Sequence, residues 1–312
     1  MPEHKLCFSA QRGFFSHDND IADWKFRATT QPSLGLLDRP YPTDEEPNEG
    51  AARDSSSSAQ WARFQSYIKR LNSEDPQNKQ YKLFYMVRHG QGVHNVKKTE
   101  VGREEWNRYW AKLPGDSTAN WLDAALTPYG KAQATGLASL WTGDHGIQSP
   151  QSIYSSPLRR CLQTTSHAFA PLLSQTIPIV KESLRERLGV HTCDERSTRS
   201  WIAEAFPEFR IEEGLSEEDE LWQVDRRETI EEHTERSTRF LEAIFDNDRS
   251  ETIALVAHSG TLIALFAATG WGKIKVAAGV LYPLLVCGTR NPTVKHCLQA
   301  ATLSSGSRLK VN

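Results

Sequence analysis

The sequence YKLFYMVRHGQGVHNV, residues 81–96, places an arginine and a histidine directly after a short run of apolar and aromatic residues. Residues 81–87 have the length and composition of a buried β-strand. Gly90 then interrupts the apolar pattern. We therefore predict a strand whose carboxyl end carries Arg88 and His89.

Beyond this strand, segments with strand and helix character alternate along the chain. Further strands are predicted at residues 151–156, 176–180 and 252–258, and helices at residues 61–72, 129–142, 158–173, 226–245 and 261–269. Such alternation is typical of an α/β fold, with a mostly parallel central sheet covered by helices on both faces, an α/β/α sandwich of three layers. Residues 273–288 predict an edge strand, because Pro283 has no N–H to donate to a neighbouring strand.

The chain is expected to divide into an extension and a main domain. Residues 38–58 are rich in Pro, Asp, Glu and Ser, which predicts an exposed loop. The arm before this loop holds large apolar residues that would be unfavourable in water. We therefore expect residues 1–80 to form an N-terminal extension that packs on the main body, residues 81–312.

Composition and charge argue against several classes of protein. The 312 residues are 38% hydrophobic and 24% charged, with a formal net charge of −2, which fits a globular protein and not a general binder of nucleic acid or anionic membranes. The longest apolar stretch, residues 276–286, is too short to span a bilayer. The five scattered cysteines predict neither a disulfide framework nor a zinc site. No secretory signal is recognised, so we expect a cytoplasmic protein.

Three predicted strands end in residues suited to phosphate. RHG (88–90), SPLRR (156–160) and HSG (258–260) each follow a strand, and ligands of parallel sheets bind beyond the carboxyl ends of strands. Arginine presents a planar fork to phosphate oxygens, and a neutral imidazole can accept a phosphoryl group. A lone histidine at a strand end is most often structural, but cations from three strand ends would repel one another without an anion. The sequence predicts a phosphate site that needs no metal ion and no cofactor.

The order of the motifs resembles the histidine phosphatase superfamily, in its phosphoglycerate-mutase-like branch. The motifs are RHGQGVHN (88–95), LTPYGKAQATGL (126–137), SSPLRRCLQT (155–164), LRERLG (184–189) and VAHSG (256–260). The amino-terminal arm and HTCDERS (191–197) are also similar to a fungal-type subgroup. The resemblance implies the fold of that superfamily and a phosphohistidine intermediate.

The resemblance also implies the roles of individual residues. His89 is expected to be the nucleophile, in a pocket lined by Arg88, Arg160 and His258, and the cationic pocket is expected to lower the pKa of His89 and keep it neutral. Arg159 is then a residue of the surface or of a helix start. The other residues expected to bind substrate are Gly90, Gln91, His94, Asn95, His191 and Ser259, although His94 and His191 could instead serve only in packing.

The general acid is expected at Glu186, which matches the glutamate of the superfamily's LxER segment. A carboxyl group can protonate a leaving oxygen only if burial and the neighbouring phosphate raise its pKa, and Arg185 and Arg187 oppose that rise. Asp194 and Glu195 lie close by in the sequence. They remain alternative candidates for the acid.

Three functions are compatible with this pattern. The leading one is a phosphatase that hydrolyses a small-molecule phosphate monoester. The second is a cofactor-dependent phosphoglycerate-type phosphomutase, whose additional cations for a substrate carboxylate would be Arg185, Arg187, Arg196 and Arg199. The third is a non-catalytic protein that binds a phosphorylated ligand, and the presence of every expected catalytic residue argues against it.

Overall fold

A central sheet organises the chain. The computed structural model describes residues 6–18, 31–44, 56–143, 146–272 and 276–290. Its strands are β1 (Leu6–Gln11), β2 (Lys79–Arg88), β3 (Ser152–Ser155), β4 (Ile179–Val180), β5 (Arg210–Ile211), β6 (Thr252–Ala257) and β7 (Leu281–Arg290). Its α-helices are α1 (Ser57–Glu74), α2 (Val93–Val101), α3 (Arg103–Arg108), α4 (Pro128–Ala138), α5 (Arg159–Ala168), α6 (Arg199–Ala205), α7 (Ile230–Asn247) and α8 (Ser259–Ala268).

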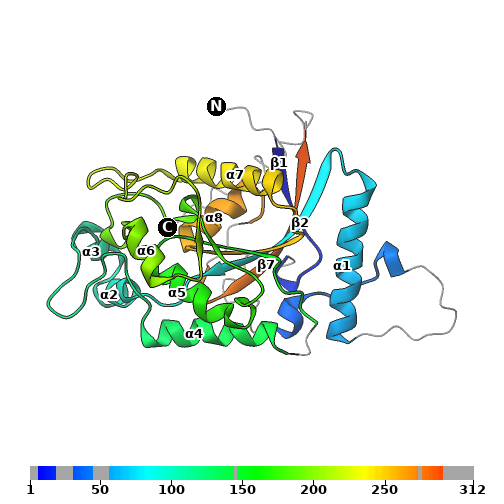
Figure 1. Cartoon of the computed structure of the whole chain (residues 1–312), viewed down its shortest axis with the longest axis horizontal. Helices are drawn as coiled ribbons and strands as arrows, with labels where there is room; N and C mark the ends of the chain where they lie inside the picture. The colour runs from blue at the N-terminus through cyan, green and yellow to red at the C-terminus, as the bar shows by residue number, and fades with distance from the viewer. Residues whose placement is uncertain (1–5, 19–30, 45–55, 144–145, 273–275, 291–312) are drawn as a thin grey trace, which may run out of the picture.

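The sheet is mostly parallel, as the alternation of strands and helices predicts. The strand order is β1-β7-β2-β6-β3-β4-β5, in which β2, β6, β3, β4 and β5 pair in parallel. β7 pairs antiparallel with both β1 and β2. Helices α7 and α8 cover one face of the sheet, and α1, α4 and α5 cover the other (Figure 1). The fold is a three-layer α/β/α sandwich. None of the described helices has the length and apolar character that crossing a bilayer requires.

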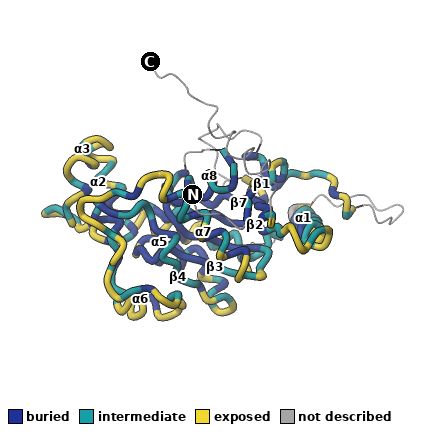
Figure 2. Tube along the Cα trace, turned by 90° about the horizontal axis from the view of Figure 1, so that it is seen from above, coloured by how far each residue is buried: buried dark blue, intermediate teal, exposed yellow. Residues whose placement is uncertain are grey.

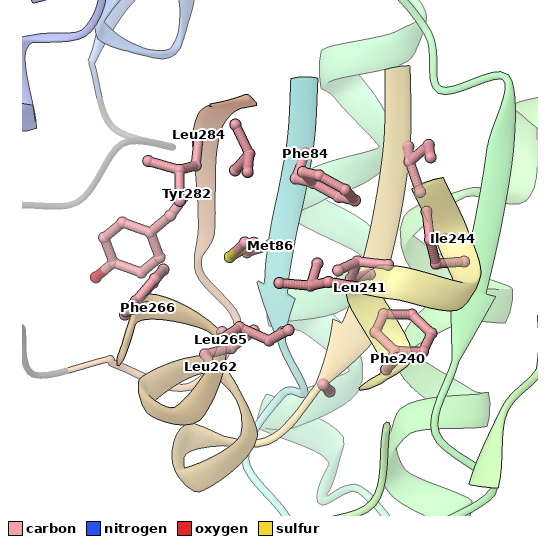
Figure 3. Packing of buried hydrophobic residues seen from close by; sticks show 14 of the residues in the cluster. Phe84, Met86, Phe240, Leu241, Ile244, Leu262, Leu265, Phe266, Tyr282 and Leu284 are labelled. Atoms are coloured by element: carbon pink, nitrogen blue, oxygen red, sulfur yellow. The ribbon is translucent and has the colours of Figure 1, made fainter. Parts of the chain in front are cut away.

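Strand β2 is buried on both faces. Successive side chains point to opposite sides of a strand, and each side of β2 packs against an apolar cluster. Phe84 and Met86 face the cluster formed with α7 and α8, where they lie near Leu241 and Leu265 (Figure 3). Tyr85 points to the opposite cluster, which contains residues of α1, α4 and α5. The strand that carries the catalytic candidates is therefore held between two apolar layers.

Strand β7 is an internal strand, and the prediction of an edge strand is wrong. β1 pairs with β7 only as far as Leu285, so Pro283 lies beyond the end of β1. The carbonyl of Pro283 accepts a 2.9 Å hydrogen bond from Nε2 of His17. In an antiparallel strand the nitrogen and carbonyl of one residue face the same side. The proline nitrogen therefore faces a side on which the described residues form no further strand beside it, which is why the sheet tolerates it.

The amino-terminal arm shares the apolar core on the α1 side of the sheet. Phe15 and Leu34 are fully buried there beside Trp61 of α1. Tyr41 is also buried, with its ring centroid 6.1 Å from that of Phe64, although it lies in the segment predicted to be an exposed loop. Residues 45–55 of that segment lie outside the described residues.

Helices α2 and α3 lie at one end of the molecule, and α1 lies at the other (Figures 1 and 2). α2 begins five residues after the end of β2, so both short helices are placed beyond the carboxyl end of that strand. Their outer surface is largely exposed (Figure 2). This arrangement puts α2 and α3 beside the end of the sheet where a ligand is expected.

Candidate active site

Three strand ends bring the expected catalytic residues together. Strands β2, β6 and β3 are neighbours that pair in parallel, so their carboxyl ends lie at one edge of the sheet. His89 follows β2, His258 follows β6, and Arg160 lies in the first turn of α5, which follows β3. The rings of His89 and His258 lie edge to face with centroids 5.1 Å apart. Nε of Arg160 lies 3.3 Å from Nε2 of His89.

His89 and Arg160 face a cavity of about 430 Å³ with a strongly cationic lining. The charged residues that line it are Arg88, Lys98, Arg103, Arg160, Arg187, Arg227, Glu186 and Asp194. Six cationic groups thus face two carboxylates. A cleft lined mainly by one sign of charge concentrates ions of the opposite sign. The cavity therefore suits an anionic ligand of small-molecule size.

The hydrogen bonds of His89 place the proton of its ring on Nδ1 and leave Nε2 unprotonated, where it accepts a hydrogen bond from Nε of Arg160. Nδ1 lies 2.6 Å from the carbonyl oxygen of Gly90, which can only accept, so the proton of a neutral ring resides on Nδ1. Nε2 then carries the lone pair on the side of Arg160. Burial, followed by the charges of Arg160 and Arg88, holds the pKa of His89 well below its ordinary value. The ring is therefore neutral at neutral pH.

Arg160 is held in place by a buried network. Its Nη2 donates to Oδ1 of Asp194 at 2.9 Å, and its Nη1 donates to the carbonyl of Cys193. Oδ2 of Asp194 accepts from Nη1 of Arg227, also at 2.9 Å. Burial opposes the ionisation of Asp194, but Arg227 and Arg160 outweigh it and lower the pKa of that carboxyl. A carboxylate held ionised by two arginines is poorly suited to donate a proton.

Glu186 lines the same cavity and is positioned by two helices. Its Oε2 accepts from the amide of Gly260 at 3.0 Å and from Oγ of Ser259 at 3.5 Å, both in the first turn of α8. Arg236 of α7 donates to the carbonyls of residues 183, 185 and 186, which fixes the loop that carries Glu186. Glu195, the other alternative, does not line the cavity. Glu186 is thus the carboxyl group best placed to act as an acid.

Two further histidines surround His89 in different ways. The resemblance implies that His258 lines the pocket, but its ring is fully buried beside His89 and does not line the cavity, and its Nε2 lies 2.8 Å from Oγ of Ser156. His94 does line the cavity, and its ring centroid lies 5.7 Å from that of His89. Nδ2 of Asn95 donates to Nε2 of His94 at 2.9 Å. His94 can therefore contact a ligand, whereas His258 packs against the ring of His89.

The residues between β2 and α2 divide into supports and lining residues. The amide of Gly90 donates to Oγ1 of Thr164 at 3.1 Å, and a Cβ on Gly90 would lie 2.2 Å from the carbonyl oxygen of Gly130. This close approach requires glycine, so Gly90 serves to position His89 and does not line the cavity. Gln91 lines a second cavity of about 670 Å³. Asn95 lines both cavities.

The cationic residues that line the cavity differ in part from those that were expected from the sequence. Of the four arginines considered for a substrate carboxylate, only Arg187 lines the cavity. Arg185 and Arg196 are buried and both pair with Glu182, while Arg199 lies exposed at the start of α6. The cations that reasoning missed are Lys98, Arg103 and Arg227. The position of Lys98, three residues after Asn95 on α2, is a signal that could have identified it.

His191, Cys193 and Asp194 bring potential metal-ligand atoms within 4.8 Å of one another. The surroundings of these three side chains do not favour binding of a metal ion. Asp194 is paired with two arginines, and burial raises the pKa of the Cys193 thiol well above its ordinary value. His191 lines the cavity beside Trp106, so its side chain faces the space that a ligand would occupy. The four cysteines in the described residues are free, and Cys297 lies outside them.

Comparison with known proteins places these residues in context. Residues 84–275 match the sequence profile of the histidine phosphatase superfamily (branch 1). A relative from Arthroderma benhamiae, named "Probable phosphoglycerate mutase", is 35% identical over 90% of this chain and 84% of its own length. One from Saccharomyces cerevisiae, named "Probable phosphoglycerate mutase PMU1", is 37% identical over 59% of this chain and 71% of its own. A solved structure of a mycobacterial glucosyl-3-phosphoglycerate phosphatase is 25% identical over 61% of this chain and 79% of that chain, with a TM-score of 0.38.

Proposed function

Because this chain belongs to the histidine phosphatase superfamily (branch 1), as its motifs predict, we propose that it hydrolyses a small-molecule phosphate monoester through phosphorylated His89. The observation that carries the proposal is the state of His89. Its proton is held on Nδ1 by the carbonyl of Gly90, and its Nε2 lone pair lies at a cationic cavity. A neutral imidazole beside bound phosphate is what nucleophilic attack at phosphorus requires.

The reaction proceeds in two balanced steps. Nε2 of His89 attacks phosphorus in line, the bond between phosphorus and the ester oxygen breaks, and Glu186 transfers its proton to the leaving oxygen to give a free alcohol. Water then attacks the phosphorus of phosphohistidine, the ionised Glu186 accepts a proton from that water, and inorganic phosphate leaves. Glu186 and His89 both return to their starting states.

In this proposal, the positive charges of two arginine side chains stabilise the phosphoryl group during its transfer. Arg88 and Arg160 both line the cavity, and positive groups fixed in advance around the equatorial oxygens are the main requirement of phosphoryl transfer. Nη1 of Arg88 donates to the carbonyl of Val276 at 2.7 Å, which holds its guanidinium at the site. We therefore propose that turnover needs no added metal ion.

A phosphomutase is the second candidate, supported by the names of the fungal relatives and by Lys98 and Arg103, two further cations in the cavity. The two activities share the attack by His89 and differ in the acceptor. A phosphatase gives the phosphoryl group to water. A mutase returns it to a hydroxyl group of a bound acid.

Release of inorganic phosphate tests the proposal. A panel of phosphate monoesters is incubated with the protein in excess chelator, and the same assay is run on His89→Ala and on a control, His167→Ala, which alters a histidine outside the cavity. We expect phosphate release from the parent and the control and none from His89→Ala. Release that persists in His89→Ala contradicts the proposal. Isomerisation of a phosphoglycerate without net phosphate release would favour the mutase.

A further inference from the structure

Asp123 is a buried acidic residue with a strained backbone, in the turn that precedes α4. It is only 4% exposed, and its φ of +41° lies in the left-handed region that residues with a Cβ rarely adopt. Such conformations persist only where the surrounding structure fixes them, and they cluster at functional sites. Asp123 is not among the residues that line the cavity beside His89. Any contribution of Asp123 to the site must therefore pass through the residues that it contacts.

One oxygen of Asp123 caps the helix that carries Arg160. Oδ1 accepts a 2.8 Å hydrogen bond from the amide of Arg159, the first residue of α5. The first amides of an α-helix have no partner within the helix, and the N-cap residue of α5 is Leu158, whose side chain has no hydrogen-bonding group. Asp123 supplies the acceptor that Leu158 lacks. It thereby fixes the first turn of α5, in which Arg160 lies.

The other oxygen of Asp123 holds the segment that anchors the guanidinium of Arg160. Oδ2 accepts from the amide of Ser197 at 3.1 Å and from its Oγ at 2.7 Å. The amide of Asp123 donates to the carbonyl of Thr192 at 3.4 Å. The carbonyl and the carboxylate that accept from the guanidinium of Arg160 belong to residues 193 and 194, between these two points. Asp123 therefore binds the anchoring segment on both sides of the anchor.

These contacts form a closed ring around Arg160. Its backbone is fixed through the amide of Arg159, its guanidinium is fixed through residues 193 and 194, and both routes end at Asp123. Burial raises the pKa of Asp123, and the hydrogen bonds to its oxygens, together with the charge of Arg160, oppose that rise. A displaced Asp123 would move the helix and the anchor relative to each other. Nε of Arg160 would then leave its position 3.3 Å from Nε2 of His89.

We propose that Asp123 is a positioning residue for Arg160: by joining the start of α5 to residues 192–197, it sets the guanidinium of Arg160 against His89. This inference rests on the proposed phosphatase function, because it gives Asp123 a part in the same phosphoryl transfer. Placement matters, since a displacement of about 1 Å in a reacting geometry can lower the rate by about 10². Aspartate suits the position because its short acceptor side chain tolerates a left-handed backbone.

Two substitutions of Asp123 separate the effect of its carboxyl group from that of its backbone strain. Asp123→Asn keeps the shape and one acceptor but presents an NH₂ group in place of the other acceptor. Asp123→Gly removes both acceptors and relieves the strain of a positive φ. The matched control is Asp248→Asn, because Asp248 also accepts from an amide and a hydroxyl group, those of Ser250 and Tyr154. Asp248 precedes β6, whereas the site lies beyond the carboxyl end of that strand.

The kinetic test measures kcat/KM for each substitution in the parent and in an Arg160→Lys background, with urea unfolding to check that each variant is folded. We expect Asp123→Asn to lower kcat/KM of the parent by about tenfold and Asp123→Gly by about 10², and Asp248→Asn to change it less than about twofold. In Arg160→Lys, both substitutions of Asp123 should cost less than about threefold, because residues that act as a unit are not additive. Equal factors in the two backgrounds, or no loss in the parent, overturn the inference.

A second readout does not depend on turnover. Nitrogen-15 NMR signals of Nε of Arg160 and Nε2 of His89 report the contact between these two atoms. Both signals should shift in Asp123→Asn and, by less, in Ser197→Ala, which removes only one donor to Asp123 and replaces Asp123→Gly if that variant does not fold. Asp248→Asn should leave them unchanged. Unchanged signals in Asp123→Asn overturn the inference. Failure of the parent to hydrolyse any ester contradicts the proposed function instead, and the NMR measurement still decides the inference.

Discussion

Nε of Arg160 lies 3.3 Å from Nε2 of His89, so one guanidinium group contacts the nucleophile while its other nitrogens are anchored by Asp194 and the carbonyl of Cys193. The lone pair of His89 and the positive charge needed by a phosphoryl group are thus placed side by side. Because Arg160 is only 1% exposed, this arrangement is set by the packed interior and not by a mobile surface side chain.

Arg160→Lys should lower kcat/KM by about 10² to 10³, because a lysine is a point charge that cannot replace the planar fork at three partners. Steady-state kinetics on any ester that the parent hydrolyses measures this. Arg159→Lys is the matched control. Arg159 is exposed and lies against the ring of Trp201, so its substitution should change kcat/KM less than about twofold. Similar losses in both variants would contradict the assignment of Arg160.

The protonation state of His89 can be observed directly by nitrogen-15 NMR of its ring. Burial, Arg160 and Arg88 hold its pKa well below the ordinary value, so the ring should stay neutral as the pH falls from about 8 to about 6.5. The proton should reside on Nδ1, which faces the carbonyl of Gly90. His89→Ala identifies the signal. A titration midpoint at or above 6.5, or a proton on Nε2, would show that this account of the nucleophile is wrong.

The variants Glu186→Gln and Asp194→Asn should show which of these two carboxyl groups is the general acid. An alkyl phosphate has a poor leaving group and needs a proton donor, whereas p-nitrophenyl phosphate does not. We expect kcat/KM for the alkyl ester to fall by about 10² to 10⁴ and that for the nitrophenyl ester by less than about tenfold. Asp194→Asn should lower both values by similar factors, because Asp194 acts through Arg160. The reverse pattern would make Asp194 the acid.

Buried histidines should make the protein less stable in acid. His233 of α7 is 2% exposed, and burial lowers its pKa to about 4. Because the folded pKa lies below the unfolded value of about 6.5, the unfolded chain takes up the proton first, and stability present above pH 6.5 is lost as the pH falls towards 4. Between pH 7.5 and 5 this loss amounts to about 2 kcal/mol for His233 alone.

Urea unfolding at the two pH values measures this effect in the parent and in His233→Gln, with His167→Gln as the control for loss of a histidine elsewhere. The His233→Gln variant should lose about 2 kcal/mol less than the parent over this range. An equal loss in the parent and in His233→Gln would show that His233 does not stay neutral in the folded protein.

The sheet and its strand ends could be predicted from the sequence because local patterns determine them. The apolar run at 81–87 and the polar residues after it correspond to β2, Lys79–Arg88, and the run at 252–258 corresponds to β6. Both strands are short, apolar and bounded by polar residues, which is what a buried parallel strand requires. The ordered motifs at these strand ends also carried the family resemblance, which is confirmed.

What the sequence did not reveal depends on partners that are distant along the chain. β7 is internal because β1, more than 270 residues earlier, pairs with it. Arg185 appeared available for a substrate, but Asp219 and Glu182 neutralise it in the folded protein. Such pairings have no local signal.

The central claim is that the phosphoryl group passes through Nε2 of His89. The most direct measurement is rapid mixing with a phosphate ester labelled with phosphorus-32, quenching in alkali, where phosphohistidine is stable, and mapping of the labelled peptide by mass spectrometry. We expect phosphate on Nε2 of His89, formed and lost at rates compatible with turnover, and no label in His89→Ala. Label on His258 or on any other residue, or hydrolysis without a labelled protein, would contradict it.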